Sequence, residues 1–304
     1  MGVDAGKRDA IVSAVPANLP EAVAAVLSAS AMEEVPSGES LTIAAAGMTW
    51  AARVWGSPND DPVLLVHGIM SDAGVFWRLG PALAAAGHRV LAIDMPAHGE
   101  TGPWRGRYAL ADTAADLAAL IRSLDLDADS LSVLGHSWGG MVVAGLPIAG
   151  IRPRKLILLD PPYLEIDDLV ALTQDPIERH CDSVEEARGR LNATHPEWSP
   201  GDVEAKARAL TRFDAEAVHS ILSRNGRWDS GLTLLAEPAA SGVPIWYLRG
   251  EPQFGGLIPD HTLPQLAARA GDSHVLTIAD GSHAPMRTHQ PEATTLAILH
   301  ALAG

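Results

Sequence analysis

The sequence is poor in cysteine and has no long apolar run. Cys181 is the single cysteine among 304 residues, which excludes a disulfide within the chain and a zinc site built from cysteines. Without a disulfide framework, a reducing compartment is expected. No apolar stretch reaches the roughly 18 residues of a membrane span, and Asp9, Pro16, Pro20 and Glu21 interrupt the apolar residues near the N-terminus. We therefore expect a cytoplasmic protein with neither a signal peptide nor a membrane anchor.

Positive charge is also scarce. The chain has 22 lysines and arginines against 37 aspartates and glutamates, for a net charge of −15. Phosphate backbones and anionic lipid surfaces repel such a chain, so we expect no nucleic-acid partner and no membrane partner. The same charge favours a small substrate that is neutral or apolar. The oligomeric state stays open, and a homo-oligomer is included among the alternatives.

Several cofactor signatures are missing. No glycine-rich loop of the dinucleotide-binding or phosphate-binding type follows a predicted strand, and no helical His-x-x-x-His pattern with a glutamate base is present. We therefore expect no nucleotide, no catalytic metal and no other cofactor.

Short apolar runs do alternate with alanine-rich helical stretches. Four of these runs are apolar nearly throughout, which is typical of strands buried on both faces; they span residues 62–67, 89–94, 130–135 and 155–160. Residues 41–45 and 49–55 read as an opening hairpin, and residues 110–124 as an amphipathic helix. The alternation predicts an α/β fold with a doubly wound, mostly parallel sheet.

The alternation of strands and helices does not extend over the whole chain, and its limits predict how the chain divides into regions. Residues 1–38 read as an N-terminal extension. Residues 39–162 and 229–304 carry the alternating pattern and form the predicted core. Residues 163–228 have helical segments and no strand-like run, so we expect an inserted helical cap over the carboxyl edge of the sheet, where open α/β sheets bind ligands.

The sharpest motif is Gly135-His136-Ser137-Trp138-Gly139. It matches G-x-S-x-G, directly follows a predicted strand and directly precedes a predicted helix, which is the context that this motif requires. A nucleophilic serine on such a strained turn needs small flanking residues, because larger side chains would clash. Ser137 is therefore the candidate nucleophile.

With this motif the sequence resembles the α/β-hydrolase superfamily from about residue 40 to its end. His67-Gly68 after an early buried strand looks like the family's oxyanion loop, and residues 94–101 look like the turn after the following strand. Gly281-Ser282-His283 is similar to the loop that carries the catalytic histidine. The resemblance implies the α/β-hydrolase fold and a serine hydrolase with Ser, acid and His in that order.

The resemblance also implies roles for individual residues. His283 is the candidate base, since it follows the last predicted strand. Backbone N–H groups of Ile69 and Trp138 would form the oxyanion hole, with Met70 as the alternative to Ile69. Among the other histidines, we interpret His136 as structural.

The acid departs from the common pattern. Most relatives carry an aspartate three residues beyond the glycine that closes the penultimate strand, and here that position is Gln253. Asp160, at the end of the strand after the nucleophile, and Glu251 are the two main alternatives, with Asp260 as a third. We favour Asp160 by a narrow margin, although a purely structural role for it is the competing interpretation.

The pocket around this site is expected to be apolar and aromatic. Candidate substrate contacts are Met70, Trp77, Tyr163 and Phe254, together with Trp104, Trp138, Trp198 and Trp228. Core packing is the competing interpretation for any one of them.

A serine nucleophile disfavours haloalkane dehalogenase and epoxide hydrolase chemistry, which needs an alkyl–carboxylate ester intermediate.

The sequence thus predicts a cofactor-free serine hydrolase of a carboxylic ester or lactone. Hydrolysis of a carbon–carbon bond and perhydrolysis are alternatives on the same triad. A receptor that keeps the fold and binds a small ligand without turnover is the alternative from another class.

Overall fold

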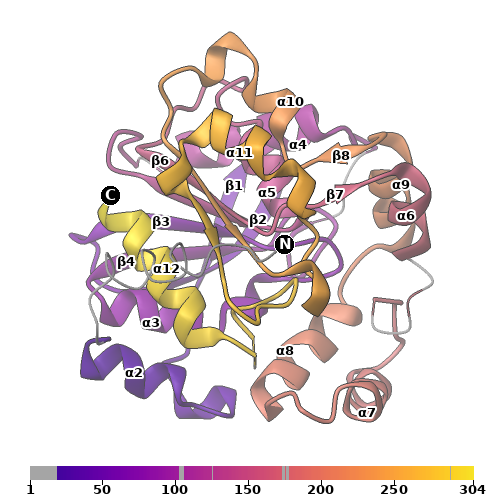
Figure 1. The fold of residues 1–304 in the computed structure, drawn as a ribbon. Coiled ribbons are helices and arrows are strands. Elements are labelled where there is room, and N and C mark those ends of the chain that lie inside the picture. Colours follow the sequence, from indigo (N-terminus) through magenta and orange to yellow (C-terminus); the bar gives the residue numbers. More distant parts are fainter. Residues whose placement is uncertain (1–18, 103–105, 125, 173–174, 176–177, 288) are drawn as a thin grey trace.

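The structure is a computed structural model that describes residues 19–102, 106–124, 126–172, 175, 178–287 and 289–304 (Figure 1). Residues 1–18 of the expected N-terminal extension and Trp104 of the expected pocket lie outside the described residues. Within the described residues, no helix combines the length and the apolar character that crossing a bilayer requires.

The core is an eight-stranded sheet with the strand order β1-β2-β4-β3-β5-β6-β9-β10. From β4 to β10 neighbouring strands are parallel, whereas β1 and β2 join at one edge as an antiparallel pair. The strands are β1 (Glu39–Ala45), β2 (Met48–Trp55), β3 (Asp61–Val66), β4 (His88–Ile93), β5 (Ser132–His136), β6 (Lys155–Leu159), β9 (Ile245–Arg249) and β10 (Val275–Thr277). The predicted doubly wound, mostly parallel sheet is confirmed.

Sequence and structure agree strand by strand, with shifts of one or two residues at the ends. Every residue of β5, β6 and β9 is buried, as continuous apolar runs require when helices cover both faces. The opening hairpin is also confirmed, and its turn places Ala46 and Gly47 at φ 53° and 73°, the left-handed values of a tight hairpin connection.

Helices cover the two faces of the sheet. On one face, α3 and α12 pack in a cluster that includes Leu83 and Ile298, with α2 behind α3; on the other, α4, α5, α10 and α11 pack in the larger cluster. Their bounds are α2 (Glu21–Leu27), α3 (Leu79–Ala85), α4 (Leu110–Ser123), α5 (Trp138–Ala144), α10 (Leu232–Leu235), α11 (Leu263–Ala270) and α12 (Pro291–Ala303).

Among its described residues, the segment 163–228 has four α-helices, which gather on one side of the molecule (Figure 1). They are α6 (Ile166–Ala171), α7 (Val184–Thr194), α8 (Pro200–Leu210) and α9 (Ala215–Arg224). The expectation of no strand in this segment is corrected at its boundary, where β7 (Tyr163–Leu164) pairs antiparallel with β8 (Trp228–Asp229). A two-residue strand is too short for an apolar pattern to reveal it. The pairing lays the two ends of the segment side by side.

Candidate active site

Ser137 stands on a sharp turn between β5 and α5. Its backbone has φ 55° and ψ −126°, a region that residues with side chains rarely adopt. A Cβ atom on Gly135 would lie 2.3 Å from the carbonyl oxygen of Gly139, and one on Gly139 would lie 2.5 Å from the carbonyl oxygen of His67. Both glycines of the motif are therefore required by close backbone packing. The helix begins at Trp138, two residues earlier than the sequence pattern predicted.

His283 connects Ser137 to Asp160. Its Nε2 lies 2.9 Å from the Oγ atom of Ser137, and its Nδ1 lies 2.7 Å from Oδ2 of Asp160. A carboxylate can only accept, so Nδ1 carries the proton and Nε2 is left to accept from the serine hydroxyl. The three side chains form a continuous row of hydrogen bonds, contributed by the ends of β5 and β6 and by the loop after β10.

The Asp160 carboxylate is fully buried and held from three sides. Besides the His283 contact, it accepts the backbone N–H groups of Gly250 at 3.1 Å and Leu257 at 2.9 Å. Asp160 itself has a φ of 45°, so the chain turns sharply as it leaves β6. Asp and Asn tolerate this conformation better than most residues.

The other two candidate carboxylates bond elsewhere. Glu251 accepts the N–H of Asp280 at 2.8 Å, and Asp260 forms an ion pair of 2.7 Å with Arg249. Of the three alternatives left open by the sequence, Asp160 is the one that contacts His283.

The loop at residues 67–70 passes directly over Ser137. A Cβ atom on Gly68 would lie 3.4 Å from the Oγ atom of Ser137. Met70 donates its N–H to Nε2 of His98 at 3.2 Å. Because this N–H already has a partner, Ile69 is the better candidate of the two for an oxyanion donor. Ile69 and Trp138 therefore flank Ser137, one in this loop and one at the start of α5.

Two buried histidines shape these loops. His67 accepts the N–H of Met95 through Nε2 at 2.9 Å, as His98 accepts that of Met70. Burial lowers the pKa of His67 to about 4 and that of His98 to about 3, so both rings are neutral at pH 7 and can accept. Both rings therefore orient the backbone of these loops.

The predicted substrate contacts occupy different surroundings. Met70 is buried in the loop over Ser137. Tyr163 lies on β7, where its hydroxyl accepts from Arg227 at 3.1 Å. Trp77 packs in a separate cluster and donates its indole N–H to Asp202 of α8 at 3.0 Å, while Phe254 is 46% exposed on a surface turn. Trp77 thus lies in a packed cluster, and Phe254 lies on the surface. A substrate role for Met70, Trp77, Tyr163 and Phe254 stays a prediction.

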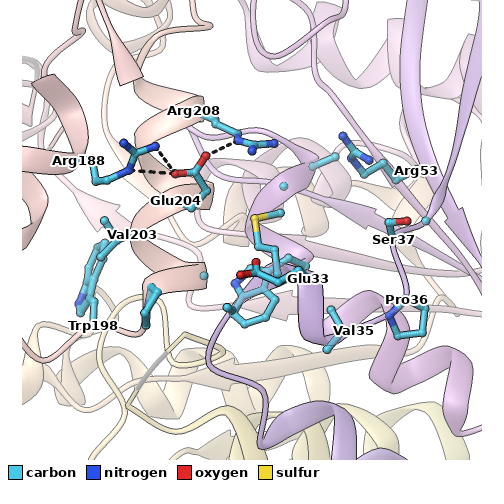
Figure 2. A pocket seen from close by; sticks show the side chains of 18 of the residues that line it. Glu33, Val35, Pro36, Ser37, Arg53, Arg188, Trp198, Val203, Glu204 and Arg208 are labelled. Carbon is cyan, nitrogen blue, oxygen red and sulfur yellow. Dashed lines mark hydrogen bonds and ion pairs between the residues drawn. The ribbon is translucent and has the colours of Figure 1, made fainter. Parts of the chain in front are cut away.

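A cavity of about 760 Å³ lies elsewhere, between the segment at residues 31–38 and helices α7 and α8 (Figure 2). Trp77, Trp198 and Val203 contribute apolar walls, and Glu204 bridges Arg188 and Arg208 across its rim. Ser137 is not among its lining residues. This cavity is separate from the candidate active site.

Two buried cations near the site have no signal in the sequence. Lys206 of α8 donates from Nζ to the carbonyl oxygen of Met70 at 3.1 Å and forms an ion pair with Glu178. Arg287, four residues after His283, is 9% exposed. Neither belongs to a recognisable motif, and Lys206 reaches the loop at Met70 only because α8 packs against it.

Among the described residues, no three His, Cys, Asp or Glu side chains are grouped so that they could hold a metal ion.

A doubly wound sheet with a Ser–His–Asp row at the carboxyl ends of its strands is the architecture of the α/β hydrolases. A sequence profile described as the Alpha/beta hydrolase family matches residues 63–296, and the chain belongs to that family.

Individual relatives are similar over part of the chain. A human protein named serine hydrolase-like protein is 35% identical over 125 residues, which cover 39% of this chain and 60% of the relative. The chain spans between 27% and 60% of the length of the first three curated relatives that it matches.

Solved structures match almost the whole fold. The structure of E-2-(acetamidomethylene)succinate hydrolase superposes with a TM-score of 0.72 at 21% identity and covers 88% of this chain and 100% of its own. An esterase from Thermogutta terrifontis superposes with a TM-score of 0.66 at 25% identity and covers 87% of this chain and 98% of its own.

Proposed function

We propose that the protein is a serine hydrolase that cleaves a carboxylic ester or a lactone through an acyl-enzyme. The observation that carries this proposal is the pair of contacts of His283, 2.9 Å to Ser137 and 2.7 Å to Asp160. A serine hydroxyl is a poor nucleophile until a base takes its proton, and this row supplies the base and its partner.

In the first half-reaction Oγ of Ser137 attacks the substrate carbonyl while its proton moves to Nε2 of His283. Asp160 accepts from Nδ1 throughout and stabilises the imidazolium that forms. Negative charge develops on the former carbonyl oxygen, where the N–H groups of Ile69 and Trp138 donate. The intermediate collapses as the C–O bond breaks, and His283 returns the proton to the leaving alkoxide.

In the second half-reaction a water molecule attacks the acyl-enzyme. His283 takes one proton from this water, and the second tetrahedral intermediate releases the carboxylic acid and restores the Ser137 hydroxyl. Each proton is thus passed between the substrate, water and the chain's own residues.

We further propose that residues 163–228 act as a cap over this site. Lys206 of α8 bonds to Met70 in the loop over Ser137, and Asp214 at the start of α9 donates its N–H to Ala97 at 2.9 Å. The segment therefore touches both loops that flank the site.

A fluorophosphonate probe tests the nucleophile. We expect one label on the peptide that contains Ser137, together with release of p-nitrophenol from short-chain p-nitrophenyl esters. Ser137→Ala should abolish both signals. Hydrolysis that survives in this variant, or labelling of another serine, would contradict the proposal, and specific ligand binding without turnover would favour the receptor alternative.

A further inference from the structure

Arg287 is a buried cation without a counter-charge in contact. The Cζ atom of its guanidinium lies over the ring of Trp198, 5.0 Å from the ring centre, and the residue is 9% exposed. None of the ion pairs and side-chain hydrogen bonds of the described residues includes its guanidinium. The guanidinium nitrogens are not among the fully buried polar atoms that lack a hydrogen-bond partner, so the group keeps some contact with solvent.

The two acidic groups whose charges act on Arg287 are already engaged by other cations. Asp202 forms a buried ion pair with Arg78, and Glu178 forms one with Lys206. Both carboxylates favour the charged form of Arg287 from a distance, yet burial still lowers its pKa. A guanidinium remains charged at any physiological pH, so this position carries a positive charge that the fold has removed from water.

The position of Arg287 is tied to the reacting residues. Its N–H bonds to the carbonyl oxygen of Ala284 at 3.1 Å, which closes a turn directly after His283. Such a turn keeps its first and fourth Cα atoms within about 7 Å of one another. Lys206, the second buried cation, donates to the carbonyl oxygen of Met70 in the loop over Ser137.

Both cations also act on His136, the neighbour of Ser137. The pKa of His136 lies well below its usual value because of burial first, then because of His283, and then because of Arg287 and Lys206. The ring of His136 lies 4.9 Å from that of His283, centre to centre. Both cations thus contribute to the lowered pKa of a residue that is directly next to Ser137.

We propose that Arg287 binds a carboxylate at the non-reacting end of the substrate, with Trp198 supporting one face of the guanidinium. This inference rests on the proposed function and names its substrate class: an ester or lactone that carries a free carboxylate. An uncompensated buried charge is costly, and a bidentate carboxylate is the partner that the planar guanidinium fits best. It differs from the expectation of a neutral or apolar substrate, which rested on the net charge of the chain and on the apolar and aromatic residues expected around the site.

Two esters of similar length test the proposal. Mono-p-nitrophenyl glutarate ends in a carboxylate, whereas p-nitrophenyl hexanoate ends in a methyl group. We expect kcat/KM to favour the glutarate ester by about tenfold or more. In Arg287→Gln this preference should fall by about thirtyfold, which corresponds to about 2 kcal/mol at 1.4 kcal/mol per tenfold change.

Arg287→Lys keeps the charge but loses the planar N–H donors that bind a carboxylate through two hydrogen bonds. This variant should retain part of the preference for the glutarate ester. Arg188→Gln is the matched control, because Arg188 is a half-exposed arginine of α7 that pairs with Glu204. This control should keep the preference of the native chain. Equal kcat/KM values for the two esters in the native chain, or an Arg287→Gln variant with an unchanged preference, would overturn the proposal.

Calorimetry with Ser137→Ala separates this inference from the proposed function, since binding needs no turnover. Monomethyl glutarate should bind more tightly than dimethyl glutarate, and adding Arg287→Gln should weaken the binding of the monoester about thirtyfold. Equal affinities would overturn the carboxylate site even if Ser137 proves to be the nucleophile. A preserved monoester preference in a protein that the fluorophosphonate does not label would overturn the serine mechanism and leave the carboxylate site standing.

Discussion

The ring of His136 donates a hydrogen bond from Nε2 to the main-chain carbonyl oxygen of His283, 2.9 Å away. The residue directly before Ser137 thus holds the loop that carries its partner. Because a carbonyl oxygen can only accept, the proton of the neutral His136 ring lies on Nε2. The structural role expected from the sequence therefore has a specific content: His136 links the turn at Ser137 to the loop that carries His283.

We expect His136→Ala to lower kcat by about ten- to a hundredfold with a smaller change in KM, since small misplacements of reacting groups have effects of this size. Steady-state kinetics on a p-nitrophenyl ester measures both constants. His136→Gln should recover part of kcat, because its amide can donate to the same carbonyl. Equal losses in both variants, or a change confined to KM, would exclude this positioning role.

The choice of acid gives a second prediction. Asp160→Asn keeps the shape of the side chain but offers His283 a group that can stabilise the wrong tautomer, which costs about 10⁴ in kcat in the best-studied serine protease. We expect a loss of at least about a hundredfold, against less than about tenfold for Glu251→Gln. The reverse order would make Asp160 a structural residue and Glu251 the acid.

A third prediction concerns Asp72, which caps the turn after the loop over Ser137. Burial, and then the nearby charge of Asp94, raise the pKa of Asp72 to about 7. The folded protein therefore holds this proton more tightly than the unfolded chain, in which aspartate titrates near 4. The resulting stabilisation is complete below about pH 4 and is lost as the pH rises to about 7.

As the pH rises across this window, the native chain loses a stabilisation that Asp72→Asn does not lose. We therefore expect the Tm of the variant to increase relative to that of the native chain. The asparagine keeps an oxygen that can accept the N–H of Gly74, now bonded to Asp72 at 2.8 Å. Thermal unfolding from pH 4.5 to 8 measures the effect. Asp129→Asn, at an exposed position, serves as the control. A difference that is constant with pH would refute the shifted titration.

The fourth prediction concerns the contact between α8 and the core. Asp202 is buried, pairs with Arg78 and accepts the indole N–H of Trp77. Removing one partner of a buried pair costs about 3–5 kcal/mol, because the other charge is left without compensation. We expect this loss in the free energy of unfolding of Asp202→Ala.

Glu204 provides the comparison on the same helix. It pairs with Arg188 and Arg208, whose side chains are 46% and 45% exposed, so Glu204→Gln should cost less than about 1 kcal/mol. Urea unfolding measures both variants. Similar losses for the two would show that Asp202 contributes no more than a surface pair.

The sheet and the Ser137 turn could be predicted because their signals are local. A strand buried on both faces must be apolar throughout, and the turn requires Gly135 and Gly139 to be glycine. The acid was ambiguous for a physical reason. Both Asp160 and Glu251 follow the ends of strands, and the sequence does not show that the chain turns at Asp160, with φ 45°, and that its carboxylate contacts His283.

The buried cations Lys206 and Arg287 could not be predicted from local sequence signals. Lys206 lies on a helix that looks solvent-exposed in sequence, and it becomes buried only when α8 packs against the loop at Met70. The sequence likewise gave no warning that Trp77 would bond to Asp202, 125 residues away. Long-range packing decides these positions, and it leaves no periodic pattern in the chain.

The pairing of β7 with β8 has an evolutionary consequence. Leu164 faces Trp228 across this short ladder, and neighbouring strands are about 4.8 Å apart, so the chain leaves and re-enters the core at almost the same point. An insertion anchored in this way can be lengthened, shortened or exchanged for another in a single genetic event, while the order and register of the eight core strands stay as they are. If the segment is the cap that we propose, its exchange by recombination would alter the substrate range without the gradual redesign that a change inside the sheet would demand.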